Sequence, residues 1–165
     1  MFKFFFFRLF LIFVFLISFT SIYYDFKEHN INTKLQTLKF NHESIIRLFN
    51  SSMHICHLGE KEIELKTSKL NNEIYKMSCN VFENDTSQIV DKLIFYLNSE
   101  DFKNPYVINL KAFYLGKEND KQEIGSTKII VNGKIITVKS LYLDKKENIH
   151  QLRNSINDKR YDQSE

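Results

Sequence analysis

The sequence predicts an α+β protein: an apolar N-terminal segment, then a small exported domain with one or two helices and an antiparallel sheet of about five strands. Three observations predict this class. An apolar stretch opens the chain, the apolar period after it changes between about 3.6 and 2, and an Asn-Gly pair joins two runs rich in β-branched residues. A chain of 165 residues fits a single domain of this kind.

The N-terminal segment from Phe4 to Tyr24 is 21 residues long and almost entirely apolar. At 1.5 Å per residue, a helix of this length crosses a hydrocarbon core of about 30 Å. Arg8 interrupts the stretch, and the uninterrupted run from Leu9 to Ile22 is 14 residues long, a length also found in signal peptides. We therefore expect residues 1–24 to be a transmembrane anchor or an uncleaved signal.

The charges and aromatic residues around this segment indicate its orientation. Lys3 and Arg8 carry the only charges before Tyr24, so the positive-inside rule places the N-terminus in the cytoplasm and the domain outside it. Tyr23 and Tyr24 lie where an outer aromatic belt is expected. Ser18-Phe19-Thr20 is a poor match to a signal-peptidase site, which favours a single-pass membrane protein over the alternative, a cleaved and secreted one.

The next elements follow from apolar spacing. Residues 25–41 are expected to be a juxtamembrane helix or a linker, and spacings of three, four and seven predict a helix over 42–53. Alternation with period two predicts a hairpin from residues 62–66 and 75–81. Capping side chains at 85–87, followed by an apolar stripe of helical period, predict an amphipathic helix over 87–99.

The remaining elements are predicted strands. The run at 106–115 is rich in β-branched and aromatic residues. Asn132-Gly133 joins 127–131 to 134–143 and predicts a type I′ turn, in which Val131 faces Lys134 and Ile129 faces Ile136. One face of this hairpin should be buried, and its members are Ile129, Val131, Ile136 and Val138. The α+β domain is thus expected over 42–143, and residues 144–165 form a polar tail.

Charge balance argues against one class of partner. Beyond residue 24 the chain has 21 Lys and Arg residues against 20 Asp and Glu, a net charge of about +1 by subtraction. Nucleic-acid-binding proteins usually carry a concentrated basic excess, so no nucleic-acid partner is expected.

Cys56 and Cys79 are the two cysteines of the chain, and in an exported domain they can form a disulfide. A bridge between them would close about 24 residues and stabilise the fold by roughly 3 kcal/mol. Two separate buried thiols are the alternative. His54, Cys56, His57 and Cys79 also form the donor set of a tetrahedral metal site, although their spacing does not bring them to one face of a helix or strand.

Catalytic motifs are missing from the sequence. No nucleophile elbow, zinc-protease helix or Gly-rich phosphate loop is present, so neither an enzyme nor a cofactor is expected. Asn50 and Asn84 match the N-glycosylation acceptor pattern, which matters only in a eukaryotic secretory pathway.

These observations favour a non-enzymatic, membrane-anchored protein whose exported domain binds a protein partner or helps assemble a complex at the membrane. The alternatives are a secreted ligand-binding module and, less favoured, a metal-binding protein using the four His and Cys residues named above. The order of elements is similar to that of pilin-like subunits, but MFKFFFFRLF lacks the Gly and Glu of that family's processing site. No family is therefore assigned from the sequence.

Overall fold

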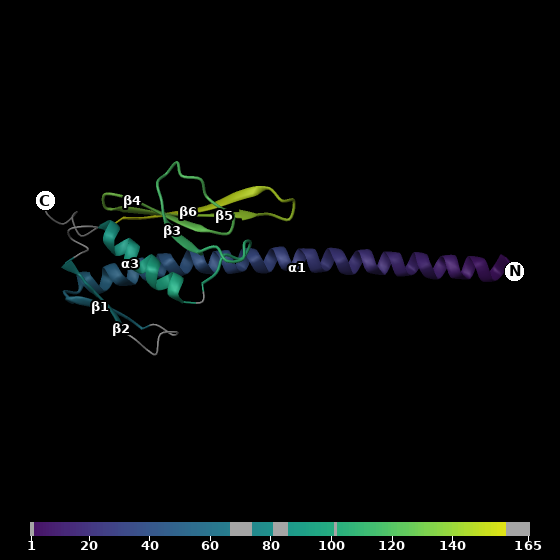
Figure 1. Cartoon of the computed structure of the whole chain (residues 1–165), viewed down its shortest axis with the longest axis horizontal. Helices are drawn as coiled ribbons and strands as arrows, with labels where there is room; N and C mark the ends of the chain where they lie inside the picture. Colours follow the sequence, from purple (N-terminus) through teal and green to yellow (C-terminus); the bar gives the residue numbers. More distant parts are fainter. Residues whose placement is uncertain (1, 67–73, 81–85, 101, 158–165) are drawn as a thin grey trace. The chain divides into compact units, whose positions relative to one another are not determined.

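The computed structural model of the chain describes residues 2–66, 74–80, 86–100 and 102–157, and within these ranges it describes side chains from residue 12 to residue 156 (Figure 1). The chain divides into two compact units, Met1–Thr33 and Lys34–Glu165. The helix α1, Phe2–His57, supplies the first unit and the first 24 residues of the second. The helix predicted over 42–53 lies within α1, and residues 25–41 are helical as well.

The second unit is an α+β domain with one hydrophobic core, as predicted for the fold class. The turns of α1 between Ile45 and Met53, the helix α3 (Thr86–Ser99) and two sheets all contribute to it. The largest fully buried side chains are Phe49, Phe113, Leu38, Ile45, Ile63, Met77, Ile89, Leu93, Ile129 and Ile136. An aromatic pair extends this core, because the Phe102 ring meets Phe113 edge-on at 5.4 Å.

Helix α3 confirms the prediction of an amphipathic helix almost to the residue. Its buried side chains follow helical spacing, since each lies three or four positions from another on the same face. They are Ile89, Val90, Leu93, Ile94 and Leu97. The helix ends at Ser99, whose hydroxyl donates to the carbonyl of Tyr96 and satisfies one of the last carbonyl groups.

The strands form two sheets instead of the single sheet predicted. β1 (Glu62–Lys66) and β2 (Ile74–Ser78) form an antiparallel pair, as the alternating pattern indicated. The second sheet has the order β3-β4-β5-β6, with β3 at Phe113–Leu115, β4 at Thr127–Asn132, β5 at Ile135–Leu143 and β6 at Ile149–Asn157. It is mixed, because β3 runs parallel to β4 while the other pairs are antiparallel (Figure 1).

The β4–β5 hairpin is present, but its register differs from the prediction by two residues. Asn132 pairs with Ile135, so Gly133 and Lys134 are the central turn residues. Gly133 has a φ of +59° and Lys134 does not have a positive φ, the pattern of a type II′ turn in place of type I′. Val131 therefore faces Ile136, and Ile129 faces Val138. A shift of two keeps every side chain on its predicted face, so the predicted buried face survives.

Two predicted boundaries were wrong. Residues 106–115 are a strand only at Phe113–Leu115, and the residues before it form a loop in which Val107, Ile108 and Leu110 are exposed. The polar tail expected from residue 144 instead contains β6, nine residues long, which pairs along the whole of β5. The apolar content of a segment misled the prediction in both cases, because neighbouring strands decide which segment joins a sheet.

Candidate functional site

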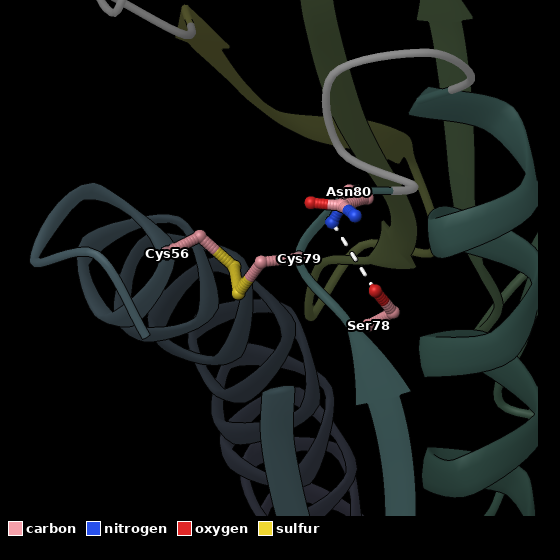
Figure 2. Close-up of a disulfide and its surroundings, with 4 residues drawn as sticks. All are labelled: Cys56, Ser78, Cys79 and Asn80. Atoms are coloured by element: carbon pink, nitrogen blue, oxygen red, sulfur yellow. Dashed lines mark hydrogen bonds between the residues drawn. A yellow bond between two sulfur atoms is a disulfide. The ribbon is translucent and has the colours of Figure 1, made fainter. Parts of the chain in front are cut away.

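The predicted pair of cysteines forms a disulfide. Cys56 lies in the last turn of α1 and Cys79 directly follows β2, with an S–S distance of 2.02 Å and 5.4 Å between the Cα atoms (Figure 2). The Cys79 N–H donates to the carbonyl of Lys61 at 2.8 Å, which ties the same residue to the start of the hairpin. The bridge therefore fixes the β1–β2 hairpin to the end of α1.

The alternative metal site loses its thiolates in this arrangement. Cys56 and Cys79 are bonded to each other, and a disulfide sulfur is not a thiolate ligand. His54 and His57 are exposed on the last turn of α1. Among the residues that the structure describes, no three His, Cys, Asp or Glu side chains gather closely enough to hold a metal ion.

The other predicted site residues are spread over α1 and one undescribed segment. Arg8 and Leu9 lie where side chains are outside the described part, whereas Ile22, Tyr23 and Tyr24 are more than 60% exposed. Over the residues searched, no helix combines the length and the apolar character needed to cross a bilayer. Of the two glycosylation candidates, Asn50 is exposed on α1, and Asn84 lies outside the described residues.

A site that the sequence did not reveal is the outer edge of β6. Within the described part of the chain, β6 is the last strand of its sheet, and nothing pairs with its second edge. All nine of its residues pair one-to-one with β5, from Ile149 opposite Leu143 to Asn157 opposite Ile135. Its apolar residues occur at 149, 152 and 156, a helical spacing, which hid the strand. Leu152, Asn154 and Ile156 alternate along one face of β6, and this period of two is visible in the sequence only if the polar Asn154 is counted with its two apolar neighbours.

A groove of about 510 Å³ lies beside this edge, between β6 and α1. Leu152 and Ile46 supply apolar surface from the strand and the helix, respectively. The side chains of Glu43 and Arg47 pair across one helical turn at 2.9 Å on the exposed side of α1. The remaining lining residues are Lys39, His42 and Asn154. The groove thus combines apolar surface with both signs of charge.

The base of the groove is a hydrogen-bond network that links four elements, α1, β4, β5 and β6, and is buried except at Asn154. His42 Nε2 donates to Asn154 Oδ1 at 2.8 Å, because an amide oxygen only accepts, and Nδ1 then accepts from the Ser140 hydroxyl at 2.8 Å. Ser140 in turn lies 2.7 Å from the Thr127 hydroxyl. Burial lowers the pKa of His42, although the Asn154 hydrogen bond partly opposes this, so the ring is neutral at neutral pH.

The hydrogen-bonded order of Ser140, His42 and Asn154 matches that of a nucleophile, a base and an orienting amide. Access decides its role, because Ser140 is completely buried and His42 is only 3% exposed. An attacking oxygen needs a substrate atom about 3 Å away, and no substrate reaches a fully buried hydroxyl. In this conformation these hydrogen bonds therefore hold α1 against β5 and β6 and fix the shape of the groove.

The opposite face of the same sheet is covered by the chain itself. Lys128, Lys139 and Arg153 are direct neighbours across β4, β5 and β6, and the two lysines are almost fully buried. Glu118 accepts a hydrogen bond from Lys139 and lies 3.6 Å from Arg153, and the bond from Lys139 is the main reason that the pKa of Glu118 is lowered. Lys128 donates to the carbonyls of Glu118 and Asp120 at 3.2 and 2.8 Å. The charged groups of these residues are therefore paired within the domain, which favours the β6 edge as the candidate site for a partner.

Comparisons of the chain with protein-family models, with curated proteins and with solved structures find no match.

Proposed function

We propose that this chain is a non-enzymatic, membrane-attached protein whose domain captures an extended segment of a partner protein along β6. The observation that carries the proposal is the nine-residue edge of β6 beside the 510 Å³ groove. An added strand would pair its backbone with the edge and direct alternate side chains toward the groove.

The composition of β6 supports strand addition. Proteins usually protect edge strands with Pro, Lys, bulges or short length, because unpaired backbone groups attract other strands. β6 contains neither Pro nor Lys and pairs with β5 without a bulge over nine residues. Its one Arg, Arg153, lies 3.6 Å from Glu118, which partly neutralises its charge. β3, at the other edge, is only three residues long and offers far less backbone. The unprotected edge is the one beside the groove.

The expected affinity follows from the two parts of the surface. About four backbone hydrogen bonds at about 1 kcal/mol each correspond to a Kd of about 1 mM, which is too weak for a specific complex. Burying two apolar side chains against Ile46 and Leu152, at about 1.5 kcal/mol each, lowers the Kd to roughly 10 μM. The groove therefore supplies the specificity, and a partner segment should alternate apolar and polar residues.

Membrane attachment is the second part of the proposal and is supported by the sequence. The stretch from Phe4 to Tyr24 has the length and composition of an anchor, and two basic residues precede its continuous apolar run. A disulfide between Cys56 and Cys79 is in keeping with a domain on the oxidising side of that membrane. Attachment would also raise the local concentration of partners on the same surface, which suits a weak edge interaction.

The test uses the full chain in the membrane of its own cells. A photo-crosslinking residue replaces Ser155 on β6 in one variant, and it replaces the exposed Lys121 in the control. We expect one discrete adduct from position 155, with the crosslink inside an extended segment of the partner, and none from position 121. Equal labelling from both positions would contradict the proposed edge site. A full-length mass in alkali-washed membranes tests attachment separately, and a shortened soluble form would contradict it.

Proline substitutions test whether the crosslink at position 155 depends on backbone pairing with β6. Adjacent residues of a strand direct their N–H groups to opposite sides, so His150 and Gln151 include one N–H that faces β5 and one that faces the free edge. Of His150→Pro and Gln151→Pro, the variant that keeps the melting temperature of its matched alanine variant has lost only the outward N–H. The alanine controls are needed because the His150 ring also contacts Asp144 at 2.9 Å and stacks on Tyr142. That variant should lose the adduct at position 155. If it retains the adduct in full, the partner does not pair with β6.

A further inference from the structure

The loop from Asn104 to Leu110 presents an unusual apolar surface. An isolated β-bridge between Lys103 and Lys111 closes it. Ile108 is 87% exposed, the highest value among the large hydrophobic side chains described, and Val107 and Leu110 are 39% and 42% exposed. Exposed apolar side chains that lie together in this way are typical of a surface that binds a protein or a membrane.

The loop is held in a defined conformation. Asn104 is buried, and its Oδ1 accepts from the N–H groups of Tyr106 and Val107 at 2.8 and 3.0 Å. Its Nδ2 donates to the carbonyl of Ile124 at 3.0 Å, which attaches the loop to the segment before β4. Asn109 adopts a φ of +71°, a conformation suited to Asn at a tight turn. These hydrogen bonds therefore hold Ile108 in its exposed position.

The apolar surface continues beyond the loop and has lysines around it. Phe102 lines a hollow of about 440 Å³ together with Ile108 and Leu110, and its ring stacks on the 63% exposed Phe40 at 5.9 Å. Lys103 and Lys111 share the walls of this hollow with one acidic residue, Glu100, and Lys34 Nζ lies 5.6 Å from the centre of the Tyr106 ring. Lysine side chains around an apolar surface can place their ammonium groups at the level of lipid phosphates.

We propose that the loop 104–110, with Phe40 and Phe102, docks into the interfacial region of a lipid bilayer containing anionic lipids. The inference rests on the proposed membrane attachment, since Lys34 is only ten positions after Tyr24, at most about 35 Å when fully extended. Apolar side chains enter the boundary between headgroups and acyl chains while neighbouring lysines attract anionic headgroups. The bilayer is favoured over a protein partner because the apolar residues have a basic border and the chain's own tether keeps them near that surface.

The chain contains no Trp, so one introduced Trp reports on its own position. Ile108→Trp places the probe at the tip of the loop, and Leu58→Trp is the control at a position 69% exposed. Leu58 directly follows α1, whose residues from Lys34, beside the loop, to His57 span about 35 Å. Both full-length variants are reconstituted in phosphatidylcholine–phosphatidylglycerol vesicles with and without brominated acyl chains, after their melting temperatures are shown to match the wild-type value.

We expect a blue-shifted emission from Trp at position 108 and roughly twofold quenching by brominated lipid, with neither effect at position 58. Unquenched emission at position 108 from chains that resist alkaline extraction would overturn the loop inference and leave membrane attachment intact. A blue shift that brominated lipid does not quench would place the Trp at position 108 in a contact between copies of the chain and would also overturn it. Chains removed from vesicles by alkali would overturn the proposed attachment itself.

Discussion

The disulfide between Cys56 and Cys79 gives the most quantitative prediction. The two cysteines are 23 positions apart in the sequence, and the bridge joins the end of α1 to the residue after β2. Reduction frees this loop in the unfolded chain and leaves every side-chain atom in place, so the change in stability reports the cross-link alone. The chain-entropy relation gives about 3.4 kcal/mol for a loop of this length. The unfolding entropy of a domain of about 130 residues converts this to a decrease of about 12 °C in melting temperature.

The assay is thermal unfolding of the full chain in a mild detergent, followed by circular dichroism with and without reductant. A Cys56→Ala/Cys79→Ala variant is the control, because it should melt near the reduced wild-type protein and not respond to reductant. Cys79 is buried in the core, so the loss of its sulfur adds a small further cost to this variant. If reduction, confirmed by a gain of two hydrogens in the intact mass, moves the melting temperature by less than about 2 °C, the bridge does not stabilise the fold as reasoned.

Three further predictions test the interior. Because burial lowers the pKa of His42, the unfolded chain binds a proton at this residue more readily than the folded chain below about pH 6.5, so the folded state should lose stability as the pH falls from there. The difference in unfolding free energy between the wild-type protein and His42→Gln, measured by urea unfolding, should therefore narrow toward about pH 5. A difference that stays constant with pH would mean that His42 titrates normally. Glu118→Gln should lower the melting temperature because the buried Lys139 loses its counter-charge, and adding Lys139→Met should restore it; failure of this rescue would contradict the pairing. Phe49→Ala should cost about 3–5 kcal/mol and Phe95→Ala, 65% exposed, less than about 0.5 kcal/mol, and similar costs would mean that the core is misassigned.

The sequence predicted those features whose signal lies within a short segment. Helix α3 carries its complete apolar stripe in 14 residues, and the faces of the β4–β5 hairpin follow from strict alternation. The alternating pattern of β1 and β2 was likewise sufficient to pair them. The cysteine pairing was predictable for a simpler reason, because two cysteines allow only one intramolecular bridge.

Features with distant partners required the tertiary structure. β3 joins β4 in parallel across an eleven-residue connection from 116 to 126, and no local pattern reports which segments meet in this way. The role of His42 depends on Ser140 and Asn154, which lie 98 and 112 residues away along the chain. Neither the groove nor its buried base was therefore visible in the sequence.

The apolar loop and β6 show the same division most clearly. Residues 106–110 have the composition of a strand and lie exposed in a loop, whereas the polar segment 149–157 forms the longest pairing in the sheet together with β5. The sequence by itself determined periodicity, charge balance and the single possible bridge, because each depends on residue identity and spacing. The tertiary structure decided which backbone pairs and which side chains stay exposed, because both depend on the partner that long-range packing brings alongside.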